Sequence, residues 1–202
     1  MKIQLINKSH TGRRSQLPLF ATSITIHGTA NPYSTAQNEA DNVCYNEPYR
    51  QVSFHFVVDD KDQIQVLPAD EVAWHAGVFD GNMTSLSIEI CESGDRLKTL
   101  RNALDLTYTL MQETHINVIK KHYDWSRKNC PRILIDSRYI KDDLDWNWFI
   151  AELEKMKMTK EEAKLIVKTK AGLNDATIQY IADDYRFGDA LITKLAKAME
   201  EK

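Results

Sequence analysis

The stretch SITIHGTA, residues 23–30, indicates the fold class of this chain of 202 residues. Its β-branched residues run up to His27 and are followed at once by small residues, a pattern typical of a strand and its end. VSFHFVVD (52–59) and SLSIEI (85–90) are two further strand-like runs, the second with the alternation of a strand that buries one face. Helical patterns lie between and after these runs. The sequence therefore predicts an α/β domain layered around one sheet.

Three segments of this domain have helical character. Residues 34–46, STAQNEADNVCYN, have a helix-forming composition. Between Leu97 and Met111, apolar residues recur at three- and four-residue steps, which predicts an amphipathic helix. Residues 143–156, DLDWNWFIAELEKM, form the third expected helix, with apolar side chains that can pack on the sheet.

The chain changes character near Met156, where strand-like patterns stop. TKEE (159–162) has the Thr-x-x-Glu form of a capping box, and the helix that it opens is expected to stop at Gly172. Two more helices are expected, one from about residue 175 to 186 and one capped by Asp189 and running to the last residue.

The predicted domains are therefore residues 1–155, the α/β domain, and residues 156–202, a small all-helical module. A unit of fewer than about 50 residues buries too little apolar surface for much stability alone. We expect the module to dock, to pair with a copy of itself in a homodimer, or to bind something.

Composition excludes two classes of partner. With 43% hydrophobic and 27% charged residues, the chain has the profile of an ordinary globular protein. A net charge of -3 argues against a nucleic-acid binder, because no basic excess can neutralise phosphates. No apolar run approaches the roughly 20 residues that cross a bilayer, so no membrane partner is expected. The N-terminus lacks the apolar stretch of a secretory signal, which predicts synthesis in the cytoplasm without a signal peptide.

The chain has three cysteines, an odd number that does not predict a closed disulfide framework. Cys44 and Cys91 fall on a helical and a strand-like segment, and we interpret both as buried structural residues. Cys130 is different, because His122 lies only eight positions before it.

Imidazole and thiolate are ligands that zinc favours, and a catalytic zinc site has three protein ligands with water in the fourth position. His27, His122 and Cys130 would make such a site. Their spacing matches no standard zinc motif, so a Cys/His nucleophile pair and a chance proximity stay open as alternatives. His55, inside a strand-like run, is interpreted as structural, whereas His75 lies in a loop where substrate contact is expected.

Four blocks occur in order and at suitable separations. They are ITIHGTA (24–30), VSFHFVVDDKDQIQVLPADEVAWHAG (52–77), GNMTSLSIEIC (81–91) and KHYDWSRKNCP (121–131). Together they resemble the zinc-dependent N-acetylmuramoyl-L-alanine amidases of the amidase 2 type, which include phage endolysins, bacterial autolysins and animal peptidoglycan recognition proteins. The resemblance extends roughly from residue 20 to residue 150.

The resemblance implies a mixed central β-sheet flanked by helices, with Zn²⁺ at the floor of an open groove. It assigns the metal ligands to His27, His122 and Cys130, and the catalytic roles to Glu89 and Lys128. Zinc lowers the pKa of bound water to about 7 and polarises the carbonyl. Glu89 would act as general base and return the proton to the leaving amine, and Lys128 would stabilise the oxyanion.

One position departs from part of the family. Where certain phage members have a catalytic tyrosine, this chain has Phe54, whose ring cannot donate a hydrogen bond. We therefore expect Glu89 to take the proton-transfer role. The residues expected to line the groove and bind substrate are Thr29, Asn31, Trp74, His75, Ala76 and Asn82.

The resemblance implies a peptidoglycan hydrolase that cleaves the amide between N-acetylmuramic acid and L-alanine. A phage or prophage endolysin that reaches the cell wall through holin-made pores fits best. Two other functions are weighed against it. A non-catalytic peptidoglycan-binding protein would bind walls without zinc or hydrolysis, and a thiol hydrolase using Cys130 and His122 would be independent of metal.

Overall fold

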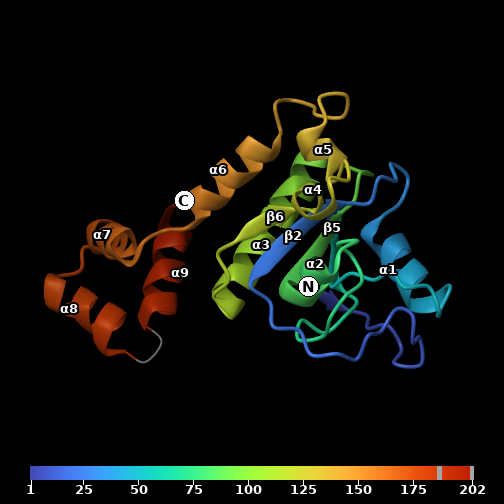
Figure 1. Ribbon diagram of the computed structural model, residues 1–202. Helices are drawn as coiled ribbons and strands as arrows, with labels where there is room; N and C mark the ends of the chain where they lie inside the picture. Colours follow the sequence, from blue (N-terminus) through green and yellow to red (C-terminus); the bar gives the residue numbers. More distant parts are fainter. Residues whose placement is uncertain (186–187, 201–202) are drawn as a thin grey trace. The chain divides into compact units, whose positions relative to one another are not determined.

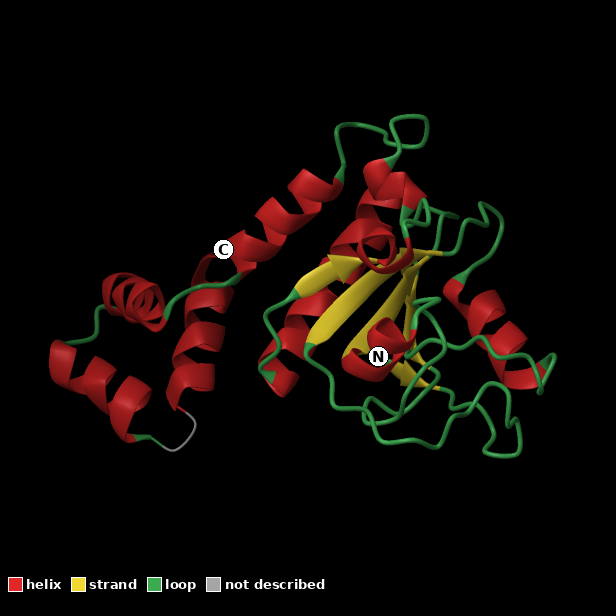
Figure 2. Cartoon of the chain, in the orientation of Figure 1, coloured by secondary structure: helices red, strands yellow, loops and turns green. Residues whose placement is uncertain are grey.

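The computed structural model describes residues 1–185 and 188–200, and the chain divides into two compact units, Met1–Glu152 and Leu153–Lys202. The first unit holds a β-sheet with helices around it, and the second contains helices (Figures 1 and 2). The first unit ends slightly before the domain boundary that was expected after residue 155.

The first unit is built on a six-stranded sheet in the order β1-β4-β3-β5-β2-β6. The strands β3 and β4 are antiparallel, while the pairs β1–β4, β3–β5, β5–β2 and β2–β6 are parallel. The bounds are β1 Lys2–Ile3, β2 Ser23–Gly28, β3 Phe56–Val58, β4 Gln63–Gln65, β5 Ser85–Ile90 and β6 Ile119–Lys121. The mixed sheet flanked by helices that was expected is thereby confirmed.

The two longest strands, β2 and β5, present an apolar and a polar face. Isoleucines and leucines such as Ile26 and Ile88 occupy one face and are completely buried. His27 and Glu89, at the carboxyl ends, occupy the other face. They are paired in register, so the parallel ladder places their side chains next to each other. Polar residues at the carboxyl ends of parallel strands are where α/β sheets place ligand sites.

Helices surround the sheet. α3 contacts β3 and β5 and buries apolar side chains on one face, as its periodicity predicts. The helix α1 begins with a capping box in which the Thr35 side chain accepts from the Asn38 N–H. The bounds in this unit are α1 Ala36–Tyr45, α2 Phe79–Thr84, α3 Arg96–Thr114, α4 His122–Ser126 and α5 Arg132–Ile135, and α6 Trp146–Met156 crosses into the second unit.

The predicted strand 52–59 was too long, because only Phe56–Val58 forms the strand β3. Before it, the backbone N–H of Ser53 donates to the Trp74 carbonyl, and that of His55 donates to the Ser87 hydroxyl. These donors are therefore not available to a strand ladder. His55 is completely buried and both of its ring nitrogens are hydrogen-bonded, which agrees with its interpretation as structural.

The second unit has its own apolar core. Its elements are α7 Lys160–Ala171, α8 Asp175–Gln179, the π-helical turn η1 Tyr180–Asp184 and α9 Gly188–Glu200. The predicted capping box is present, with Thr159 and Glu162 bonded reciprocally, and Gly172 ends α7 with a φ of 65°. The buried core residues are Ala163, Val167, Ile178, Ala182, Ile192 and Ala196. Arg186, residues 201–202 and the side chain of the expected cap Asp189 lie outside the described residues.

Among the residues that the structure describes, no helix has both the length and the apolar character to cross a bilayer.

Candidate metal centre and catalytic pocket

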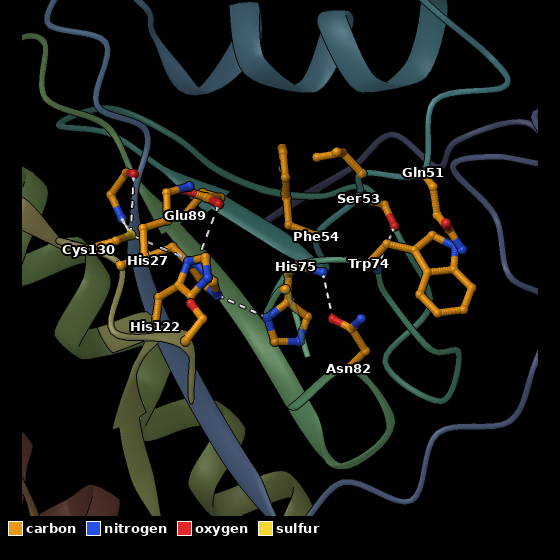
Figure 3. A pocket seen from close by; sticks show the side chains of 15 residues that line it. His27, Gln51, Ser53, Phe54, Trp74, His75, Asn82, Glu89, His122 and Cys130 are labelled. Carbon is orange, nitrogen blue, oxygen red and sulfur yellow. Dashed lines mark hydrogen bonds and ion pairs between the residues drawn. The ribbon is translucent and has the colours of Figure 1, made fainter. Parts of the chain in front are cut away.

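A cavity of about 540 Å³ lies at the carboxyl ends of β2 and β5. Figure 3 shows the side chains that point into it from β2, β5, the segment before β3 and the loops around α4. Its lining consists of His27, Gly28, Gln51, Val52, Ser53, Phe54, Trp74, His75, Gly77, Asn82, Glu89, His122, Ser126, Lys128 and Cys130.

His27, His122 and Cys130 meet in this cavity from three separate elements. His27 lies at the end of β2, His122 begins α4, and Cys130 precedes α5. One potential ligand atom from each lies within 4.8 Å of the others, and all three side chains are buried (Figure 3). The His27 Nδ1 atom lies 3.9 Å from the Cys130 Sγ atom. The structure thus brings together the three residues that the family resemblance assigns to zinc.

The donor set fits a zinc ion. Two imidazoles and one thiolate leave the fourth tetrahedral position open, as in catalytic zinc sites. The Nδ1 atom of His122 is buried and has no hydrogen-bond partner in the described part of the chain. A buried polar atom without a partner is costly, and coordination of a metal would satisfy it.

Burial keeps both histidines neutral, which metal ligation requires. Burial, with the charges of His75, His122 and Lys128, lowers the pKa of His27 well below its ordinary value. Burial and the charge of Lys128 lower the pKa of His122 to about 4, against a hydrogen bond with the Ala76 backbone. Burial, and then the charge of Glu89, raise the pKa of the Cys130 thiol to about 12.

Glu89 lies beside the three potential ligands, its Oε1 atom 3.8 Å from the His27 Nδ1 atom. Burial and the neighbouring Glu39 raise the pKa of the Glu89 carboxyl to about 8, while Lys128 opposes the shift. A carboxyl group that exchanges its proton near neutral pH can act both as general base and as general acid.

Lys128 and Phe54 also line the cavity. Lys128 is exposed, and its backbone carbonyl accepts a 2.7 Å hydrogen bond from the Cys130 N–H. Phe54 is almost completely buried. Both residues, together with Glu89 and Cys130, also line an adjoining cavity of about 300 Å³ that reaches α1. Of the three potential ligands, Cys130 lines both cavities, and His27 and His122 line the larger one.

The residues expected to bind substrate fall into different environments. Trp74 is half-buried and lines the larger cavity, and Thr29 lines the adjoining one. Asn82 lines the larger cavity, but its Oδ1 atom accepts hydrogen bonds from the N–H groups of His75 and Ala76.

The other expected binding residues are placed less favourably for contact with substrate. Ala76 is completely buried, and His75 lines the larger cavity but is buried against the His27 ring. Asn31 is exposed and outside both cavities, and its side-chain oxygen accepts from the Tyr33 N–H.

Six further lining residues were not expected: Gly28, Gln51, Val52, Ser53, Gly77 and Ser126. All of them except Gln51 lie within the motif blocks, so membership of the blocks could have indicated them. Gln51 lies just before the second block, and no sequence pattern around it indicates a pocket residue.

The family model Amidase_2, described as N-acetylmuramoyl-L-alanine amidase, matches residues 18–133. This range is more than half of the chain and contains the three potential ligands together with Glu89 and Lys128. The chain belongs to the Amidase_2 family. The family resemblance inferred from the four sequence blocks is thus confirmed.

The chain is similar to two curated relatives and to two solved structures. The chain is 37% identical over 183 residues to the amidase CwlA of Bacillus subtilis, covering 86% of this chain and 65% of CwlA. It is 42% identical over 120 residues to XlyA of the same species, covering 56% of this chain and 40% of XlyA. It therefore spans less than two thirds of the length of either relative.

The structural matches cover about three quarters of the chain. The catalytic domain of XlyA matches with a TM-score of 0.66 and 34% identity, over 76% of this chain and 99% of that domain. A mutant endolysin from Bacillus subtilis matches with a TM-score of 0.66 and 36% identity, over 75% of this chain and 97% of its own.

Proposed function

We propose that the chain is a zinc-dependent amidase that hydrolyses the bond between N-acetylmuramic acid and L-alanine in peptidoglycan. The observation that carries the proposal is the grouping of His27, His122 and Cys130 in an open cavity, with the Glu89 carboxyl 3.8 Å from His27. Membership of the Amidase_2 family and the names of the relatives support the proposed bond specificity.

The residues of the cavity have distinct roles in this reaction. His27, His122 and Cys130 would hold a zinc ion, which would act as a Lewis acid and make water more acidic and the amide carbonyl more electrophilic. The Glu89 carboxylate takes a proton from the attacking water and returns it to the departing amine of L-alanine. The Lys128 ammonium, at the rim of both cavities, stabilises negative charge on the carbonyl oxygen.

Because Phe54 has no hydroxyl group, Glu89 is the residue that carries the proton in this proposal. The Phe54 ring borders both cavities at the position where some relatives have a tyrosine, and it has no hydroxyl to donate. Its role is to provide an apolar wall in the two cavities that Glu89 also lines. An apolar wall helps to raise the pKa of a neighbouring carboxyl, because it excludes water from the charged form.

The thiol hydrolase hypothesis is disfavoured by the environment of Cys130. A nucleophilic cysteine needs a depressed pKa, which a neighbouring imidazolium or helix N-terminus provides. Here burial and the carboxyl of Glu89 raise the pKa of Cys130 to about 12, and its histidine neighbours are neutral. This thiol is a poor nucleophile but a suitable metal ligand, because a bound metal deprotonates it.

Product analysis of digested cell walls tests the proposed reaction. The purified chain should release stem peptides with a free L-alanine amino group, and a chelator should stop the release until zinc is restored. Release of reducing sugars would contradict the assigned bond. Full activity in the chelator would contradict the metal, and full wall binding without hydrolysis would favour the non-catalytic alternative.

For the second unit, we propose binding to the cell wall or self-association into a homodimer. Its small size and separate apolar core support an independent role. The similarity to an endolysin supports action at the cell wall, reached through holin pores if the chain is phage-encoded. Lysis of cells that co-express a holin, compared with cells that lack one, tests this route.

A further inference from the structure

His75 lines the larger cavity, but both of its ring nitrogens are hydrogen-bonded to other parts of the protein. It lies in the loop between β4 and α2, 48 positions along the chain from His27, and its ring is buried against the His27 ring. Its Nδ1 atom is 3.0 Å from the His27 Nε2 atom, and its Nε2 atom is 3.1 Å from the Ser85 carbonyl oxygen. Both ring nitrogens are therefore engaged inside the protein, and Figure 3 shows the contact between the His75 and His27 rings.

This chain of hydrogen bonds determines the tautomer of each ring. A carbonyl oxygen has no proton, so the hydrogen bond to Ser85 requires a proton on the His75 Nε2 atom. In a neutral ring the His75 Nδ1 atom is then an acceptor, and the His27 Nε2 atom must be the donor. The proton of His27 is thus held on Nε2, and its Nδ1 lone pair faces Cys130 Sγ at 3.9 Å.

The same loop also orients the other histidine. His122 makes a hydrogen bond with the backbone of Ala76, the residue after His75, while its Nδ1 atom remains without a partner. The loop itself is fixed by Asn82, whose Oδ1 atom accepts from the N–H groups of His75 and Ala76 at 2.9 and 2.8 Å. One short segment therefore contacts both imidazoles on the side away from the potential metal position.

We propose that His75 is a positioning residue, which fixes His27 in the Nε2–H tautomer and so presents its Nδ1 lone pair to the metal. The proposal rests on the metal centre of the proposed function. It assigns His75 to the orientation of a ligand instead of to substrate. Partners that fix the ring of a metal-binding histidine in this way commonly contribute 10- to 100-fold to metal affinity or activity.

The first test needs no substitution. Nitrogen-15 NMR of the histidine rings in the metal-free wild-type protein distinguishes the two neutral tautomers by the shifts of Nδ1 and Nε2. His27 should have its proton on Nε2, and His75 should have its proton on Nε2 as well. A proton on the Nδ1 atom of His27 would overturn the proposal, whatever the activity of the protein.

Zinc titration of variants supplies the second test. His75→Phe keeps a planar ring but removes the acceptor, and zinc affinity, measured by competition with a chromophoric chelator, should fall roughly 10- to 100-fold. His75→Asn keeps an acceptor oxygen near the position of Nδ1 and should retain more affinity than His75→Phe. Unchanged zinc affinity in folded His75→Phe would overturn the proposal.

His55→Phe is the matched control. His55 is equally buried and hydrogen-bonded through both ring nitrogens, but its partners are Ser87 and the Glu71 carbonyl instead of a potential ligand. The His55→Phe protein should be less stable than the wild type, but it should lose much less zinc affinity than His75→Phe. An equal loss in both variants would show general loosening and contradict a positioning role. Failure of the wild-type protein to bind zinc would instead refute the metal centre itself.

Discussion

Glu89 and His27 become partners because two parallel strands pair them in register, although 62 positions separate them in the chain. The alternation in β5 places Glu89 on the polar face, next to the cavity, while Ile88 and Ile90 are buried on the opposite side. A shift of the register by one residue would turn Glu89 away from the cavity. The chemistry of this carboxyl thus depends on strand pairing as much as on residue type.

Replacement of Glu89 by glutamine tests its role in proton transfer. Glutamine has nearly the same shape but cannot accept a proton, so the rate of stem-peptide release should fall by roughly 10²- to 10⁴-fold. Zinc content, measured by atomic absorption, should stay the same because Glu89 is not one of the three expected ligands. A Glu89→Gln enzyme with near wild-type rates would exclude Glu89 as the proton carrier.

The residues of the centre could be predicted from sequence to very different extents. His27, His122, Cys130 and Glu89 fall inside motif blocks, and the structure brings all four together. The place of His75 behind His27 could not be predicted, because it depends on a hydrogen bond between distant parts of the chain. Asn31, which follows the block ITIHGTA, was expected in the groove, yet its side-chain oxygen accepts a hydrogen bond from the Tyr33 N–H in a local turn.

Among the helices and strands, the length of each element decided whether the sequence could predict it. β2, β5 and α3 have enough residues for a clear period, and they were expected near their observed positions. The strands β1 and β6 have two and three residues, too few for any alternation to be recognised. They are defined by pairing with β4 and β2, which is a tertiary effect.

Asp59 connects the start of α1, the β3–β4 turn and α3 in the first unit. One carboxylate oxygen accepts from the Ala36 N–H at the start of α1, and the other accepts from the N–H groups of Lys61 and Asp62 in the β3–β4 turn. Its backbone carbonyl accepts from the Asn102 side chain on α3. Asp59 is buried, so these backbone donors have no ready access to water.

Asp59→Ala should therefore lower the free energy of unfolding by roughly 2–4 kcal/mol, because it leaves several backbone N–H groups without an acceptor. Urea denaturation of the purified protein measures this change. Asp59→Asn, which keeps an acceptor oxygen but removes the charge, should lose less. An Asp59→Ala protein as stable as the wild type would show that water replaces the carboxylate.

The segment before β2 is held to the loop between β4 and α2 by a buried ion pair between Arg14 and Glu71. The Arg14 Nη2 and Glu71 Oε2 atoms are 2.6 Å apart, and a second hydrogen bond joins Nε to Oε1 at 2.8 Å. Burial alone would raise the pKa of Glu71, but the hydrogen bonds from Arg14 and Gln16 and the Arg14 charge lower it below its ordinary value of 4.5.

The sign of this pKa shift predicts how stability depends on pH. A carboxyl whose pKa is lower in the folded state stabilises the fold above pH 4.5, and this contribution is lost as the pH falls through the folded pKa. Glu71→Gln should cost about 3 kcal/mol at pH 7, because Arg14 loses its buried partner. The difference from wild type should shrink below pH 4.5. Urea titrations of both proteins at pH 7 and at acid pH test this, and a constant difference would contradict it.

At the scale of the whole molecule, the candidate centre belongs entirely to the first unit. The cavity and all its lining residues lie before residue 131. The solved catalytic domain of XlyA is matched over 99% of its length by 76% of this chain, so a domain of this extent exists separately in a relative. The match with CwlA covers 86% of this chain and therefore extends beyond residue 152. CwlA thus shares part of the second unit.

Deletion of residues 157–202, which follow the last residue of α6, tests whether the two units have separate functions. The shortened chain should bind zinc and cleave small soluble muropeptides at nearly the wild-type rate, because it keeps every cavity residue. Its affinity for intact walls should fall by about tenfold or more if the second unit contributes a second binding site. Wall co-sedimentation measures that affinity, and analytical ultracentrifugation of the full chain shows whether the second unit causes self-association instead. Unchanged wall affinity and an unchanged oligomeric state after the deletion would refute both proposed roles, whereas loss of muropeptide cleavage would show that the catalytic unit depends on the second.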